Sequence, residues 1–168
     1  MGQSPPVRIK PKQSLGQNFL VDDNIVRNIA RDLALRDDDV VVEIGPGLGA
    51  LTREIVGRVR HLTVVEIDQR AVEEIRKEFS RPDVTILHAD ILEVSFADLR
   101  RQYRQKLRVV GNIPYHLTSP ILFKVFEERE AVADLTVMIQ REVARRILAA
   151  PGTKDNGILS VMTQFFGE

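Results

Sequence analysis

Short runs of apolar and β-branched residues recur along the chain every 22 to 28 residues. The segments between them carry apolar positions at helical spacing, three or four residues apart. Because parallel strands need a crossover of about a dozen or more residues, this alternation predicts an α/β fold, a doubly wound and mostly parallel sheet of Rossmann-like type. The expected strands are Val40–Ile44, Leu62–Ile67, Val84–His88, Leu107–Val110 and Leu135–Ile139.

Acids, prolines and glycines mark the expected helix boundaries. Asp22 and Asp23 precede IVRNIARDLAL, and acidic side chains stabilise a helix N-terminus. The last apolar run, ILSVMTQFF at 158–166, has the composition of another strand, and the sequence ends two residues later. We therefore expect the C-terminal part of the fold to be incomplete. Further helices are expected at Gly49–Arg58, Gln69–Phe79, Phe96–Gln105, Ser119–Glu128 and Arg141–Ala149.

The composition is that of one globular domain without secretory or membrane features. The 168 residues are 43% hydrophobic and 29% charged, and they include no cysteine. No apolar run approaches the roughly 20 residues of a membrane span, and the start lacks an apolar signal segment, so we expect a cytoplasmic protein with no membrane partner. Lysine plus arginine and aspartate plus glutamate number 24 each, so nucleic acid binding would need a local basic patch.

Residues 1–16 form a compositionally distinct arm ahead of a domain at 17–168. The arm contains Arg8, Lys10 and Lys12, three prolines and no acidic residue. It is interpreted either as an extended basic segment or as a disordered tail. An extended segment of this kind presents its cations to a phosphate backbone, so these three residues are candidates for substrate binding.

The segment Val40–Thr52, VVVEIGPGLGALT, combines a buried strand, a glycine-rich turn and a helix start. Glycines such as Gly45 and Gly47 let the backbone approach a ligand closely. Gly45-x-Gly47-x-x-Ala50 also matches the dinucleotide fingerprint, and Glu66 follows at the distance of a ribose-binding acid. A nicotinamide-dependent dehydrogenase is therefore one reading of this turn.

Glu43 favours a different cofactor. A carboxylate two residues before the first glycine repels a pyrophosphate but attracts a sulfonium or ammonium group, which indicates S-adenosylmethionine. The alternative is a carboxylate that only caps nearby amides. The next strand ends supply Glu66, Asp90 and Asn112, and the carboxyl ends of parallel strands meet at one edge. Glu66 is assigned to the ribose hydroxyls and Asp90 to the adenine amine, although a helix cap would explain each acid too.

The tetrapeptide Asn112-Ile113-Pro114-Tyr115 offers an amide, a rigid turn and an aromatic ring beside the cofactor. The Asn112 carboxamide and a backbone carbonyl flanking Pro114 can accept both N6 hydrogens of an adenine, while Tyr115 stacks on the base. Methyl transfer to N6 then needs positioning rather than a strong base. The alternative is a proline turn with a packed tyrosine. His116 is placed at the same base pocket, and the three histidines share no metal-ligand spacing, so no metal is expected.

Three segments resemble the KsgA/Dim1 family of ribosomal RNA adenine dimethyltransferases: KQSLGQNFL (12–20), EIGPGLGALT (43–52) and NIPYHLTSPILFK (112–124). IQREVARRI and NGILSVMTQFF are similar to later segments of that family. The resemblance implies base handling by Asn112 and Tyr115, with Phe19 bordering the pocket. It implies cofactor contacts from Asn18, Leu20, Gly45, Gly47, Glu66, Asp90 and Asn112.

The resemblance further implies N6,N6-dimethylation of two adjacent adenosines in a hairpin loop near the 3′ end of small-subunit (16S) rRNA. The substrate would be a pre-30S particle, the product S-adenosylhomocysteine and the enzyme a monomer. Erm enzymes, which methylate large-subunit RNA, share related motifs, but Leu15-Gly16 and Ser119-Pro120 fit the small-subunit enzymes better. The family's aromatic loop, closing strands and small helical C-terminal domain have no counterpart here, so a non-catalytic RNA-binding assembly module is the other alternative.

Overall fold

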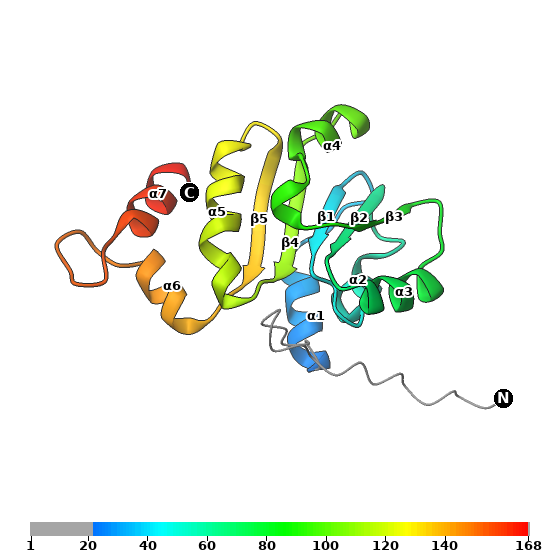
Figure 1. Ribbon diagram of the computed structural model, residues 1–168, viewed down its shortest axis with the longest axis horizontal. Coiled ribbons are helices and arrows are strands. Elements are labelled where there is room, and N and C mark those ends of the chain that lie inside the picture. The colour runs from blue at the N-terminus through cyan, green and yellow to red at the C-terminus, as the bar shows by residue number, and fades with distance from the viewer. Residues whose placement is uncertain (1–21, 168) are drawn as a thin grey trace.

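A computed structural model describes residues 22–167 as one parallel sheet covered by helices on both faces (Figure 1). The strand order is β3-β2-β1-β4-β5, and every neighbouring pair is parallel. This is the doubly wound architecture that the strand spacing predicted, with the switch in winding direction between β1 and β4. The strands are β1 (Val40–Ile44), β2 (His61–Glu66), β3 (Val84–His88), β4 (Leu107–Asn112) and β5 (Val132–Met138).

Side-chain N-caps explain where three of the helices begin. The carboxylate of Asp22 accepts from the backbone N–H of Asn24, and Asp68 and Ser95 cap two further helices in the same way. Within residues 22–167 no helix is both long and apolar enough to span a bilayer. The helices are α1 (Asp23–Asp32), α2 (Ala50–Ile55), α3 (Gln69–Glu78), α4 (Phe96–Tyr103), α5 (Thr118–Glu127), α6 (Arg141–Ile147) and α7 (Ile158–Phe166), with the short 3₁₀ turns η2 (Ile91–Glu93) and η3 (Tyr115–Leu117).

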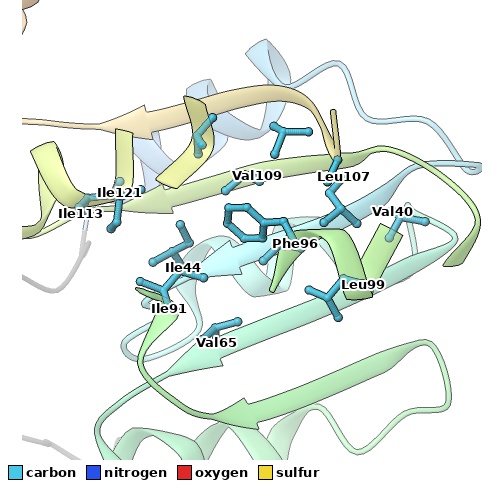
Figure 2. Close-up of a cluster of buried hydrophobic side chains, with 14 residues drawn as sticks. Val40, Ile44, Val65, Ile91, Phe96, Leu99, Leu107, Val109, Ile113 and Ile121 are labelled. Atoms are coloured by element: carbon cyan, nitrogen blue, oxygen red, sulfur yellow. The ribbon is translucent and has the colours of Figure 1, made fainter. Parts of the chain in front are cut away.

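The sheet separates two apolar cores, and alternate residues of β1 enter each one. Val40, Val42 and Ile44 pack with residues of η2, α4 and α5, whereas Val41 packs with residues of α2 and α3. Phe96 is fully buried in the first core, where Figure 2 shows its ring between the strands and α4. Burying such a side chain contributes about 1.5–3 kcal/mol, so Phe96 helps to hold α4 on this face of the sheet.

The prediction of a strand at 158–166 is wrong, because this run forms α7. Its backbone makes the hydrogen bonds of an α-helix. For example, the Gly167 N–H donates to the Thr163 carbonyl at 2.8 Å. One side of the helix packs on α5, where the rings of Phe166 and Phe126 stack with centroids 5.4 Å apart. The Ser160 hydroxyl also donates to the Arg146 carbonyl of α6. A short apolar run fits either a strand or a helix, and here packing against α5 and α6 decides for the helix.

Several predicted boundaries also shift. The helix expected at Gly49–Arg58 spans only Ala50–Ile55, because Val56 leaves the helical conformation with a ψ of 130° and Gly57 has a positive φ of 76°. The strand expected at Leu135–Ile139 begins earlier, at Val132, and β4 continues to Asn112. The first helix ends three residues before the predicted Leu35, because Leu33 is its C-cap and Ala34 has a positive φ of 44°. The other predicted elements agree with the structure to within one or two residues at each end, and β1 and β3 agree at both ends.

Candidate active site

The glycine-rich turn after β1 opens the candidate site and is bonded to the end of β2. Gly45, Gly47 and Gly49 all have positive φ, between 57° and 77°. The Gly45 N–H donates to the Val65 carbonyl at 2.9 Å, and the Gly47 N–H donates to Glu66 Oε2 at 3.4 Å. A Cβ on Gly49 would lie 2.8 Å from the Phe79 ring, so this position has no room for a side chain. Gly45 thus stays exposed at the start of the turn, while close packing at Gly49 holds the start of α2 against α3.

A first pocket of about 200 Å³ lies at the carboxyl edge, over β1, β2, β3 and β4. The structure brings together here most of the cofactor residues that the sequence indicated. The lining includes Gly45, Gly47, Glu66, Asp90, Asn112 and Pro114.

Glu66 is held rigidly in this pocket. Its side chain is largely buried, with Oε1 accepting from the Asp68 N–H at 2.9 Å and Oε2 accepting from the Gly47 N–H. Burial raises the pKa of Glu66 above the usual carboxyl value, while these backbone donors oppose the rise. The carboxylate is thus oriented before any ligand arrives, which suits an acceptor for hydroxyl groups.

Asp90 and Asp68 both act as helix caps, as the sequence allowed. Asp90 Oδ1 accepts from the Leu92 N–H at 2.9 Å at the start of η2, and Asp68 caps α3. Asp90 differs from Asp68 in that it also lines the first pocket. Its capping bond fixes the side chain at the pocket wall, so structural and ligand-binding roles are compatible in one residue.

Glu43 lies outside the first pocket and carries less charge than the sequence reasoning assumed. Its side chain is 1% exposed and accepts a hydrogen bond from the Thr52 hydroxyl at 2.7 Å. Burial, with a smaller contribution from the nearby Glu66 charge, raises the pKa of Glu43 to about 7 despite the Thr52 bond. Burial thus favours the neutral form of this carboxyl, so the negative charge that the sequence predicted beside the turn is weakened.

A second pocket of about 150 Å³ lies on the other side of the glycine turn, toward α1. Gly45 and Gly47 line it as well as the first pocket, and the carboxylates of Asp32 and Glu43 also border it. The sequence reasoning missed Asp32, since it reads as an ordinary polar residue at a helix end. Neither pocket is lined by lysine or arginine among residues 22–167.

A third pocket of about 390 Å³ lies between the residues that follow β4 and those that follow β5. Asn112, Pro114 and Tyr115 line one side, and 137–140 line the other. Tyr115 is 48% exposed, so its ring is accessible rather than packed in the core. The tyrosine and the amide predicted to handle a base thus share one pocket, and Asn112 lines all three pockets.

Local hydrogen bonds fix the backbone of this turn. The Ile113 N–H donates to the Met138 carbonyl at 3.2 Å, which ties the turn to the end of β5. The Pro114 carbonyl accepts from the Leu117 N–H at 3.0 Å and from the Thr118 hydroxyl at 3.4 Å. The Pro114 carbonyl is therefore engaged within the turn.

Some functional expectations need correction or lie beyond the described residues. His116 lines the first pocket and is absent from the lining of the base pocket, so its expected place is corrected. Ile67 and Ile91 also line the first pocket and were not predicted to do so. Each directly follows a predicted site acid, and this position in the sequence could have identified them. Among residues 22–167 no group of three metal-ligating side chains is placed to hold an ion. Arg8, Lys10, Lys12, Asn18, Phe19 and Leu20 lie outside the described residues.

The chain is similar to known proteins both in sequence and in fold. The sequence profile described as "Ribosomal RNA adenine dimethylase" matches residues 8–168. A "Ribosomal RNA small subunit methyltransferase A" from Chlorobium phaeobacteroides is 50% identical over 161 residues, which are 95% of this chain and 58% of that protein. The chain thus spans a little over half the length of this relative.

Two solved structures share the fold and measurable sequence identity. A dimethyladenosine transferase from Plasmodium falciparum superposes with a TM-score of 0.77 at 25% identity, over 88% of this chain and 52% of that one. The 23S rRNA methyltransferase ErmE gives a TM-score of 0.65 at 36% identity, over 77% of this chain and 50% of that one.

Proposed function

Because the chain belongs to the ribosomal RNA adenine dimethylase family, we propose that it holds S-adenosylmethionine across the first and second pockets and an RNA adenine in the third. The observation that carries this proposal is the position of Asn112, which lines all three pockets. A methyl donor and its acceptor must meet at one point in line with the bond that breaks. The shared wall at Asn112 is where two such ligands would meet.

The lining of the first two pockets fits this cofactor by charge and by shape. Glu66 accepts hydrogen bonds from the ribose hydroxyls, and Asp90 accepts from the adenine amine. Ile67, which is 49% exposed, offers an apolar surface for a flat ring, and Ile91 lies in the same lining. In the second pocket Asp32 and Glu43 favour the ammonium of the methionine part. A dinucleotide pyrophosphate would meet carboxylates and no cation in the described lining, which disfavours the dehydrogenase alternative.

The protein groups of the third pocket position the base. S-adenosylmethionine supplies an activated methyl group with a neutral sulfide as leaving group. The carboxamide oxygen of Asn112 and the carbonyl of Ile113 accept the two N6 hydrogens and direct the nitrogen toward the first two pockets. The Tyr115 ring stacks on the adenine, a contact of about 1–3 kcal/mol per base. Positioning supplies most of the rate, since the nitrogen becomes positive only as the methyl arrives.

The proposed substrate is a pair of adjacent adenosines in a hairpin loop near the 3′ end of small-subunit rRNA, dimethylated at N6 within a pre-30S particle in the cytoplasm. The name and 50% identity of the Chlorobium relative support the small subunit over the Erm-type alternative. Residues 17–168 would form the methyltransferase domain, acting as a monomer, with 1–16 as a basic arm. Within these ranges Asn18 and Leu20 are proposed for the cofactor, Phe19 for the base, and Arg8, Lys10 and Lys12 for RNA.

Calorimetric titration with S-adenosylmethionine, S-adenosylhomocysteine and NADH tests the cofactor. Binding of the first two without NADH is expected, and preference for NADH would overturn the proposal. Mass spectrometry of an RNA hairpin with two adjacent adenosines tests the reaction. Tyr115→Ala should keep S-adenosylhomocysteine affinity and lose methyl transfer, while Phe165→Ala, an exposed aromatic on α7, should lose neither. RNA binding without transfer would instead favour a non-catalytic assembly module.

A further inference from the structure

Charge is divided along the carboxyl edge of the sheet. The first and second pockets are bordered by four carboxylates, from Asp32, Glu43, Glu66 and Asp90. A phosphate backbone that crossed this half of the edge would be repelled. The other half, beyond the third pocket, leads into α6, which carries three arginines and one acid (Figure 1). An RNA strand that enters the third pocket should therefore cross the surface over α6, where the charge is more favourable.

Helix α6 starts where the third pocket ends. Gln140 lines that pocket and is the N-cap of α6, so Arg141 is the next residue of the chain. Arg145 follows one turn later on the same side of the helix. Val143 is buried on the opposite side. The guanidinium groups of Arg141 and Arg145 are therefore on the solvent side of α6, beside the rim of the base pocket.

These two arginines differ from the third arginine of the helix. Arg146 donates to Glu142 at 3.0 Å, and this pair neutralises both charges. Within residues 22–167 neither Arg141 nor Arg145 takes part in an ion pair or a side-chain hydrogen bond. Two like charges one turn apart repel each other weakly, and an anion outside the helix would relieve this repulsion. Successive phosphates of a nucleic acid supply such anions.

We propose that Arg141 and Arg145 bind the phosphates that flank the target adenosine and so fix the RNA strand at the third pocket. This inference rests on the proposed function, because it assumes that the base in that pocket belongs to RNA. Phosphate contacts carry no sequence information, so the two arginines are positioning residues that set register and affinity. The reacting adenine itself is left to Asn112 and Tyr115.

The test compares two double variants with equal loss of charge. Arg141→Gln/Arg145→Gln removes the proposed contacts, while Arg100→Gln/Arg104→Gln removes two exposed arginines with the same spacing at the far end of α4. Fluorescence anisotropy follows binding of a labelled RNA hairpin, with saturating S-adenosylhomocysteine, between about 0.05 and 0.3 M salt. Each phosphate contact on a single strand contributes about 0.7 to the slope of log K against log salt. The α6 variant should lose about 1.4 of slope and roughly 25-fold in affinity at 0.1 M salt, and the α4 variant little of either.

Each outcome decides the proposal. A loss confined to the α6 variant supports it. Equal losses in both variants would show attraction by overall charge, and no loss in either, or no RNA binding by the unaltered chain, would overturn it. If the α6 variant loses nothing but an acidic peptide binds at α6, the partner there is a protein. Failure of the proposed function is seen separately, because S-adenosylhomocysteine binding and methyl transfer to the hairpin are measured in parallel.

Discussion

Arg108 joins three elements at the amino edge of the sheet, and its replacement by methionine tests how strongly. Its Nη1 donates to Asp39 Oδ2 at 2.7 Å, and its Nη2 donates to the Leu33 carbonyl at 2.7 Å. Its Nε donates to Asp134 Oδ2 at 2.9 Å in β5. These bonds connect the end of α1, the residue before β1, and strands β4 and β5. Methionine keeps most of the apolar stem of the side chain but removes every donor.

Burial decides which of the two ion pairs matters. The Asp39 side chain is 5% exposed and that of Arg108 18%, so losing the cation leaves a buried carboxylate, which costs about 3–5 kcal/mol. The Arg36 N–H still donates to Asp39 Oδ2 at 2.9 Å, so a value near about 3 kcal/mol is expected. The Asp134 side chain is 45% exposed, and such a pair contributes about 0–1 kcal/mol. Asp134→Asn is therefore the matched control.

Urea unfolding gives the readout. With a denaturant dependence of about 2 kcal/mol per molar, the midpoint should fall by roughly 1.5 M for Arg108→Met and by less than about 0.5 M for Asp134→Asn. Affinity for S-adenosylhomocysteine at 25 °C should stay unchanged in both, since Arg108 lies at the edge opposite the pockets. Equal midpoint shifts in the two variants would refute the assignment of the energy to the buried pair.

Three further predictions concern the site. Gly49→Ala should destabilise the fold by about 2–5 kcal/mol in thermal unfolding, because it combines a positive φ with a Cβ 2.8 Å from the Phe79 ring; an unchanged midpoint would contradict this. Glu43 binds a proton more tightly when folded, so its contribution to stability falls as pH rises from 4.5 to about 7, by up to about 3 kcal/mol. Urea unfolding of Glu43→Gln at pH 5 and 8 should lack that part of the pH dependence, and an unaltered difference would argue against a raised pKa. Glu66→Ala should weaken S-adenosylhomocysteine binding in calorimetry. Glu73→Ala, at an exposed position of α3, should leave this binding unchanged.

Local signals predicted the half of the sheet around the glycine turn. Buried strands such as Val40–Ile44 show as uninterrupted apolar runs, and the turn after them is marked by its glycines. The acid or amide at each strand end was placed correctly, since parallel strands bring Glu66, Asp90 and Asn112 to one edge whatever the details of packing. The glycine turn and three strand ends therefore required no tertiary information.

Features that depend on packing were not predictable. The hydrogen bond from Thr52 to Glu43 and the raised pKa of this carboxyl both depend on how α2 packs over β1. The far wall of the third pocket comes from 137–140, whose approach to Asn112 depends on β5 lying beside β4. The run that forms α7 was predicted as a strand because composition does not show that its apolar residues pack against α5.

Because Asn112 lines all three pockets, ligands in neighbouring pockets share one wall, and the occupancy of one pocket affects the free energy of binding in the next. Cofactor and base should then bind more tightly together than apart. Linkage makes the effect reciprocal, so whatever factor the cofactor adds to RNA affinity, RNA must add to cofactor affinity. A site of this kind favours the complete pair of reactants. Once one ligand has left, the other dissociates more readily.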